Sequence, residues 1–180
     1  PERFLKQIEK STTEREIEAS VCGFFFDQQP VARDLREISA ALKMISDMER
    51  IGDQAADIAD LSKFIDRSVV EIPDEIARMA EKTVHMVTES IDAFVKADLA
   101  LCRKVIDDDD LVDELFNQTK NKLADLIYKN MDAKAGLDLL MTAKYMERIG
   151  DHAVNIAEWV EYSITGIHRN NEHQMGGNKN

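Results

Sequence analysis

The hexapeptide Met-Glu-Arg-Ile-Gly-Asp occurs twice in the chain, at residues 48–53 and again at residues 146–151. The two copies are offset by 98 residues (146 minus 48), and the match continues beyond them at the same offset. Asp34 then aligns with Asp132, and the pair Ile58-Ala59 aligns with Ile156-Ala157. A long match at one fixed offset indicates two copies of one structural unit.

Helical periodicity defines what each unit contains. The 180 residues include only three prolines and seven glycines, and apolar residues recur at steps of three and four. The second unit is predicted to hold helices over 73–97, 98–130 and 132–165, and the first unit helices over 3–27 and 30–68. The counterpart of helix 73–97 would precede residue 1.

These assignments predict an all-α fold of two tandem, similar three-helix bundles, with the N-terminal helix missing from this chain. The predicted domains are 1–72 for the first, incomplete repeat and 73–166 for the second. Residues 167–180 are His-, Asn- and Gly-rich with few apolar side chains, so we expect a flexible tail.

The net charge of the chain limits the kinds of molecule that it can bind. The net charge of −12 opposes binding to nucleic-acid backbones or anionic lipid and suits cations and basic protein surfaces. No apolar run approaches the roughly 20 residues that span a bilayer, so no membrane insertion is expected. Cys22 and Cys102 stand far apart, as is typical of reduced thiols. These features together predict a cytoplasmic protein.

Each copy of the repeat carries two carboxylates one helical turn apart, Glu49 with Asp53 and Glu147 with Asp151. Asp57 lies one turn further along the first copy. Like charges at this spacing repel, and a glycine inside a helix costs roughly 1 kcal/mol relative to alanine. Because both penalties occur twice at matching places, the pattern indicates a site rather than chance.

A further acidic pair, Asp109 and Asp113, precedes the turn near residue 131 by about as many residues as Glu147 and Asp151 follow it. If the two helices are antiparallel, the four carboxylates converge, and such a cluster favours a neutralising cation. All-oxygen ligands suit Mg²⁺, Ca²⁺, Mn²⁺ or iron. The alternative is a solvated acidic helix face or a docking surface for a basic partner.

Catalytic motifs are absent from the sequence. It has no Gly-rich phosphate loop, no nucleophile elbow and no Cys/His metal spacing. His85 and His152 are single imidazoles, and the Glu-x-x-His motif of ferritin-like di-iron proteins does not occur. We therefore predict no catalytic residues and a protein that is not an enzyme.

Two stretches together resemble one known family. Residues 28–36 read Gln-Gln-Pro-Val-Ala-Arg-Asp-Leu-Arg, and the doubled Glu-Arg-Ile-Gly-Asp follows at 49–53 and 147–151. This combination closely resembles the PhoU family over about residues 14–165. The resemblance implies a cytoplasmic, self-associating (dimeric) regulator that restrains phosphate uptake by a phosphate ABC transporter and represses the phosphate-starvation response through a sensor histidine kinase.

The resemblance also implies metal binding, including multinuclear iron clusters, through acidic motifs that match Asp109/Asp113, Glu49/Asp53 and Glu147/Asp151. One departure concerns the first repeat, where Gln7 and Ser11 stand at places that are usually acidic. The prediction is a non-enzymatic, metal-binding helical adaptor between the transporter's ATPase subunit and the kinase. The alternatives are a metal-storing or redox helical protein, and a helical scaffold without a ligand.

Overall fold

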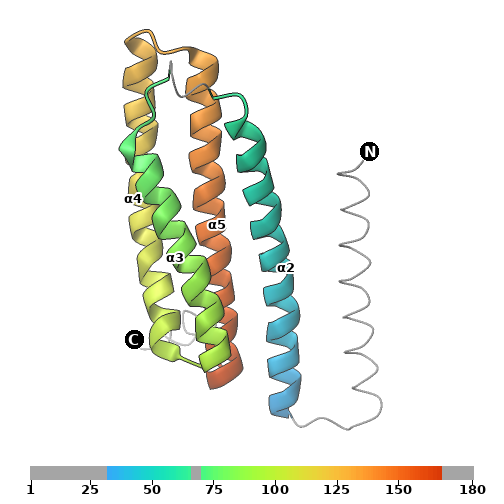
Figure 1. The fold of residues 1–180 in the computed structure, drawn as a ribbon. Coiled ribbons are helices and arrows are strands. Elements are labelled where there is room, and N and C mark those ends of the chain that lie inside the picture. Colours follow the sequence, from blue (N-terminus) through green and yellow to red (C-terminus); the bar gives the residue numbers. More distant parts are fainter. Residues whose placement is uncertain (1–31, 66–69, 168–180) are drawn as a thin grey trace, which may run out of the picture.

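The computed structural model describes residues 32–65 and 70–167, and within these ranges it contains four helices and no strand (Figure 1). The helices are α2 (Ala32–Ser62), α3 (Asp74–Lys96), α4 (Leu99–Tyr128) and α5 (Ala133–Thr165). The predicted all-α class is confirmed. The expected helix 3–27, the helix expected before residue 1 and all but the first residue of the expected tail lie outside the described residues.

The helix ends follow from local hydrogen bonds. Asp98 accepts hydrogen bonds from the amides of Ala100 and Leu101 at 2.8 and 3.2 Å, and so caps α4. Asp132 caps α5 by accepting from the Ala135 amide at 3.0 Å. The connections between α3, α4 and α5 are short, so each of these helices runs antiparallel to the one before it. Helix α2 ends at Ser62, earlier than the expected residue 68.

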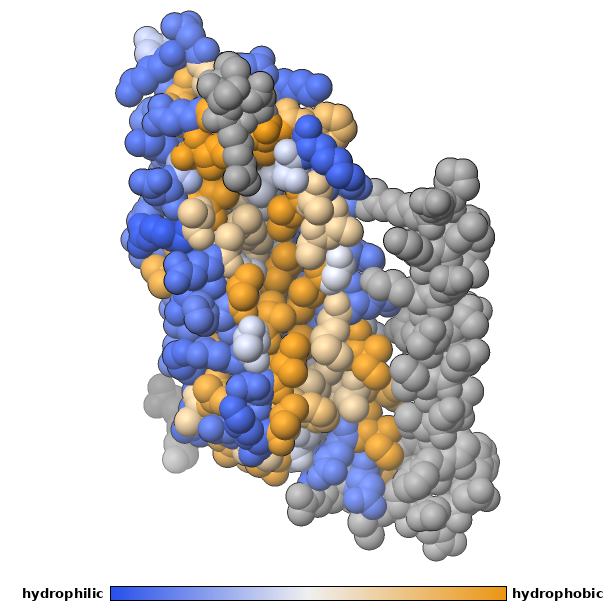
Figure 2. Space-filling model, in the orientation of Figure 1, coloured by the Kyte–Doolittle hydropathy of each residue, from blue (hydrophilic) through white to orange (hydrophobic). Residues whose placement is uncertain are grey.

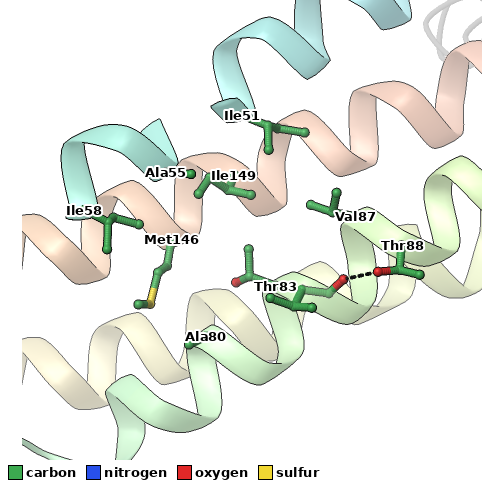
Figure 3. Close-up of a pocket in the computed structure, with 10 residues that line it drawn as sticks. Ile51, Ala55, Ile58, Ala80, Thr83, Val87, Thr88, Met146 and Ile149 are labelled. Carbon is green, nitrogen blue, oxygen red and sulfur yellow. Dashed lines mark hydrogen bonds between the residues drawn. The ribbon is translucent and has the colours of Figure 1, made fainter. Parts of the chain in front are cut away.

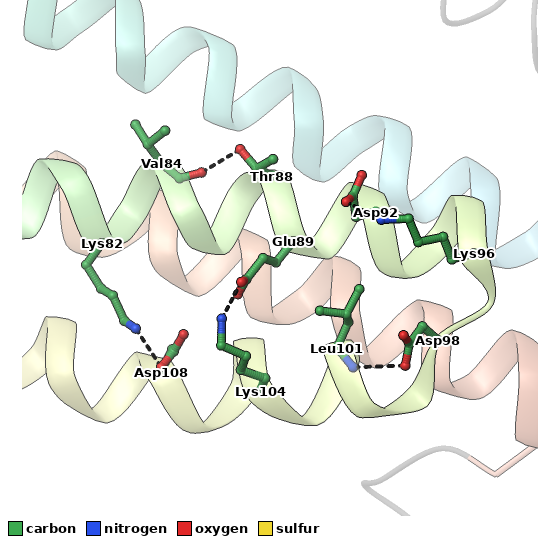
Figure 4. Close-up of polar contacts among 10 residues, drawn as sticks. All are labelled: Lys82, Val84, Thr88, Glu89, Asp92, Lys96, Asp98, Leu101, Lys104 and Asp108. Atoms are coloured by element: carbon green, nitrogen blue, oxygen red, sulfur yellow. Dashed lines mark hydrogen bonds and ion pairs between the residues drawn. The ribbon is translucent and has the colours of Figure 1, made fainter.

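Helices α3, α4 and α5 contact one another in pairs and form the three-helix bundle expected for the second repeat. Its core is built from large side chains with almost no exposure: Met79, Met86, Val105, Val112, Leu115, Leu123, Leu139, Ile156 and Val160. On the outer side of the α3–α4 seam, Lys82 pairs with Asp108 at 2.6 Å and Lys104 pairs with Glu89 (Figure 4). The bundle thus holds α4 and α5 at a fixed relative height.

Helix α2 belongs to the first repeat and packs chiefly against α5. Its apolar face and that of α3 flank a groove over α5, and Figure 2 shows this band of apolar side chains on the front of the molecule. Ile51, Val87 and Met146 are among the lining residues (Figure 3). Met48 and Met141 fit the apolar spacing of their helices, yet they are 40% and 44% exposed.

No helix in the described part of the chain is long and apolar enough to cross a membrane.

Candidate functional site

The close approach of α4 and α5 brings two of the predicted acidic pairs together. Gly150 is buried, and a methyl group built on it would lie 3.4 Å from Oδ1 of Asp109. The same methyl would lie 3.7 Å from Val112 of α4 and from Met86 of α3. Asp109 and Gly150 are therefore at one height along the two helices, as the distances from the turn near residue 131 predicted.

Burial and neighbouring charges both raise the pKa of Asp109. Burial is the largest influence and neighbouring negative charges add to it, so the pKa rises from 3.8 to about 6. In decreasing order of effect, these charges belong to Asp151, Asp113, Glu147 and Asp110. Each of the other three predicted carboxylates of the second repeat thus acts electrostatically on Asp109. The four acidic groups therefore lie near enough to interact electrostatically across the α4–α5 seam, and they are called the carboxylate cluster below.

Asp151 lies at the exposed edge of this cluster. Partial burial and the nearby charge of Glu147 raise its pKa above the ordinary value, whereas Lys144 and His152 act in the opposite direction. Lys144 is one turn before Glu147 on α5, and its ammonium contacts both carboxylate oxygens of that residue. The cluster therefore already contains one cationic neighbour from the protein itself.

Two features of this cluster match a hard divalent cation. Its donors are carboxylate oxygens, and Gly150 leaves room for a methyl-sized group directly beside Asp109 Oδ1. As the side chains stand, however, the described residues include no group of three or more histidine, cysteine, aspartate or glutamate side chains arranged to hold a metal ion. The four carboxylates would have to turn toward a shared point, and Glu147 would have to release Lys144.

Gly150 offers a direct test of that space. A Gly150→Ala substitution places its methyl at ordinary contact distances, so the metal-free protein should keep or gain stability, by up to about 1 kcal/mol from helix propensity. The same methyl takes up the room beside Asp109, so metal binding should weaken. Chemical denaturation in EDTA and a metal titration measure the two effects. A variant that is strongly destabilised without metal would contradict the spacing seen at Gly150.

The first-repeat candidates Glu49, Asp53 and Asp57 lie on α2 at successive turns. Each has a polar or electrostatic interaction within the protein. Residues 3–27, the other helix predicted for the first repeat, lie outside the described residues, and Gln7 and Ser11 are among them. The assignment of this second acidic set as a site stays a prediction.

The structure also reveals a polar centre that the sequence analysis did not find. Asp47 of α2 is only 6% exposed, and its Oδ1 lies 2.8 Å from Nδ1 of His152 on α5. Nδ2 of Asn155 donates to the same oxygen at 3.3 Å, and Arg50 lies 3.9 Å away. Asp47 precedes the repeated hexapeptide and has Tyr145 as its counterpart, so the repeat gave no signal for it. His152 belongs to no recognisable motif, so its sequence context does not mark it either.

Comparison with known proteins identifies the family to which this chain belongs. A family model described as the PhoU domain matches twice, at residues 8–62 and 76–160. The chain belongs to the PhoU family. The two matches correspond to the two repeats read from the doubled hexapeptide, and the second contains the whole acidic cluster of α4 and α5. PhoU-family membership confirms the resemblance carried by residues 28–36 and the two Glu-Arg-Ile-Gly-Asp copies.

Individual relatives agree with this assignment. The chain is 37% identical to a phosphate-specific transport system accessory protein PhoU homolog of Clostridium acetobutylicum, over 85% of this chain and 71% of that protein. It is 35% identical to the homolog of the same description from Synechocystis, over 84% of this chain and 68% of that one.

Solved structures of PhoU proteins share the fold. That of PhoU from Pseudomonas aeruginosa has a TM-score of 0.81 at 29% identity and covers 92% of this chain and 81% of its own. The regulatory protein from Streptococcus pneumoniae gives 0.77 at 21% identity, over 88% and 73% of the two chains. Both agree with the predicted fold class of tandem helical bundles.

Proposed function

We propose that this protein is a PhoU-type negative regulator: a cytoplasmic helical adaptor that restrains a phosphate ABC transporter and represses the phosphate-starvation response. Its expected partners are a second copy of itself, the ATPase subunit of the transporter and a sensor histidine kinase. Support for a transporter partner comes from relatives described as accessory proteins of a phosphate-specific transport system. Support for an adaptor rather than an enzyme comes from the absence of a catalytic motif in the sequence.

The observation that carries the mechanism is the carboxylate cluster across α4 and α5, in which burial and the charges of its neighbours raise the pKa of Asp109 to about 6. Groups held in mutual repulsion are stabilised by a bound cation. Asp109, Asp113, Glu147 and Asp151 would hold it, and Glu49, Asp53 and Asp57 would supply the related site of the first repeat. Iron, Mn²⁺, Mg²⁺ and Ca²⁺ all accept such oxygen ligands.

A bound metal would supply more positive charge to the cluster than the single ammonium of Lys144 does. The protein's own residues do the rest: α4 and α5 hold the carboxylates at one height, and Gly150 keeps space beside Asp109. Because the acidic pairs come from different helices, binding would favour the packed α4–α5 arrangement by mass action. Metal supply would in this way be linked to the surface that partners contact.

Elemental analysis of untagged protein, purified without chelators, tests the metal assignment. We expect at least one tightly bound metal per chain in the native protein and its loss in the double variant Asp109→Asn, Asp151→Asn. A matched control, Asp107→Asn with Asp110→Asn, removes two charges from the same acidic run and should retain the metal. Equal metal content in the native protein and the first double variant would exclude the cluster as the ligand set.

Partner capture separates the adaptor from its two rivals. The native protein, immobilised with and without metal, is incubated with the purified transporter ATPase subunit and with the soluble domain of the sensor kinase. The adaptor predicts saturable binding to at least one of them. If the protein stores metal, it should take up more metal ions than the proposed ligands can hold and should bind neither partner. If it is a scaffold without a ligand, it should contain no metal, and a chelator should not change its stability.

A further inference from the structure

Lys144 occupies an unusual position at the edge of the carboxylate cluster. Its ammonium meets both oxygens of Glu147, whose side chain is only 14% exposed. The same ammonium lies 5.3 Å from the centre of the Phe116 ring of α4. Lys144 itself is 43% exposed, so it is the more solvent-accessible member of the pair. A carboxylate with both oxygens turned to one ammonium offers no free edge to another cation.

We propose that Lys144 is a built-in competitor for the metal: it occupies Glu147 while the cluster is metal-free, and a cation that binds the cluster displaces it. This inference rests on the proposed metal site and adds how occupancy of that site is set. A divalent cation and an ammonium on one carboxylate edge would lie within about 4 Å of each other, where like charges repel strongly in a partly buried site. The two are therefore alternatives for Glu147.

The ammonium already lies beside Phe116 while it contacts Glu147, and it can keep this ring contact after it leaves the carboxylate. Phe116 lies on α4 beside the cluster, and an aromatic face attracts a cation within about 6 Å of its centre. The four-carbon stem of lysine is flexible, so the ammonium can leave Glu147 and stay near the ring and solvent. Apart from the turning of the carboxylates, displacement then requires a rotamer change of the partly exposed Lys144 side chain and no movement of the helix backbone.

Competition of this kind lowers the apparent metal affinity by the fraction of molecules in which Glu147 is free. A cluster of four carboxylates without such a competitor would hold a divalent cation more tightly. The lysine thus makes metal binding at this site reversible, as a metal sensor requires, rather than permanent as in a structural metal site.

Lys120 provides a matched control. Its ammonium lies 5.9 Å from the centre of the same Phe116 ring, but its hydrogen bond goes to Oδ1 of Asn117 at 3.0 Å and not to a cluster carboxylate. Substitution of either lysine by methionine removes one positive charge near the Phe116 ring and keeps the apolar stem. Only the Lys144 substitution removes the ammonium from Glu147.

The experiment measures Mn²⁺ affinity of the chelator-treated full chain, by the loss of the free Mn²⁺ signal in electron paramagnetic resonance. Lys144→Met should bind Mn²⁺ about twofold to fivefold more tightly than the native protein, the scale of one partly exposed ion pair. Lys120→Met should change affinity by less than about twofold, and Lys144→Arg should retain native affinity because arginine keeps the charge and both contacts. Thermal denaturation in EDTA should show Lys144→Met less stable than native, so its gain in affinity cannot reflect a better-folded protein.

Each outcome decides a separate point. Tighter binding by Lys144→Met alone supports the competitor role, even if the native protein binds Mn²⁺ too weakly to measure. Native binding with equal affinity in both methionine variants overturns the competitor role and leaves the metal site standing. Absence of Mn²⁺ binding in all four proteins overturns the metal site, and the competitor role with it.

Discussion

Replacement of Asp47 by alanine is expected to lower the free energy of unfolding by about 2–4 kcal/mol, because it leaves buried polar groups on α5 without their partner. Asp47 and His152 are 6% and 8% exposed, and their contact at 2.8 Å joins α2 of the first repeat to α5 of the second. The substitution also removes the acceptor of the Asn155 amide. Urea denaturation followed by circular dichroism measures the loss.

The matched control is an exposed ion pair. Asp92 pairs with Lys96 at 2.6 Å within α3, and both side chains are about half exposed. Asp92→Ala should cost less than about 0.5 kcal/mol, since solvent screens such pairs. Asp47→Asn should fall between the two, because it keeps one acceptor oxygen. If Asp47→Ala and Asp92→Ala were equally mild, the polar centre between α2 and α5 would not hold the repeats together.

Asp109→Asn is expected to act in the opposite direction and to stabilise the chelated protein at pH 7.5 by about 1–2 kcal/mol, after allowing for its partial exposure. The native protein holds the proton of Asp109 more tightly than the unfolded chain does, since the folded pKa is about 6 and the ordinary value is 3.8. Its ionised form therefore costs stability, and the cost grows as pH rises from about 4 through about 6. The gain from asparagine should disappear near pH 3.5.

A pH series of urea denaturation curves in EDTA checks this prediction, with Asp107→Asn as the control. Asp107 is exposed on the same helix and is not among the groups that act on Asp109. With saturating Mn²⁺ the sign should reverse, because the variant loses a ligand. A destabilising effect of Asp109→Asn in EDTA at pH 7.5 would mean that the cluster is not under electrostatic strain.

The fold was largely predictable because long helices carry their own signals. Proline and aspartate mark the boundaries at Pro73, Asp98 and Asp132, and the structure starts α3, α4 and α5 directly after them. The convergence of Asp109 with Glu147 and Asp151 followed from counting residues on both sides of one turn. Such counting succeeds because each helix rises by a constant 1.5 Å per residue, so equal numbers of residues give equal heights.

Side-chain direction was less predictable. Met48 and Met141 fit the apolar spacing but are 40% and 44% exposed, since apolar spacing does not reveal which flank of the stripe meets a neighbour. Asp47 looked like an ordinary charged residue, and only the packing of α2 on α5 shows that it is buried beside His152. Pairing between distant helices depends on relative rotation, which no local pattern specifies. Lys144 was missed for the same reason.

The contact between Asp47 and His152 has a consequence for how identical chains recognise one another. Helices α2 and α5 share the repeated sequence, so either helix could pack against a second copy of itself in place of the other. At the repeat offset of 98, however, Asp47 corresponds to Tyr145 and His152 corresponds to Gln54. Two α2 helices paired in the same register would set Asp47 against Gln54, and two α5 helices would set Tyr145 against His152. Only α2 with α5 joins carboxylate to imidazole. The two repeats thus differ at the two positions that form this contact, and the difference favours pairing of α2 with α5 over pairing of either helix with a second copy of itself.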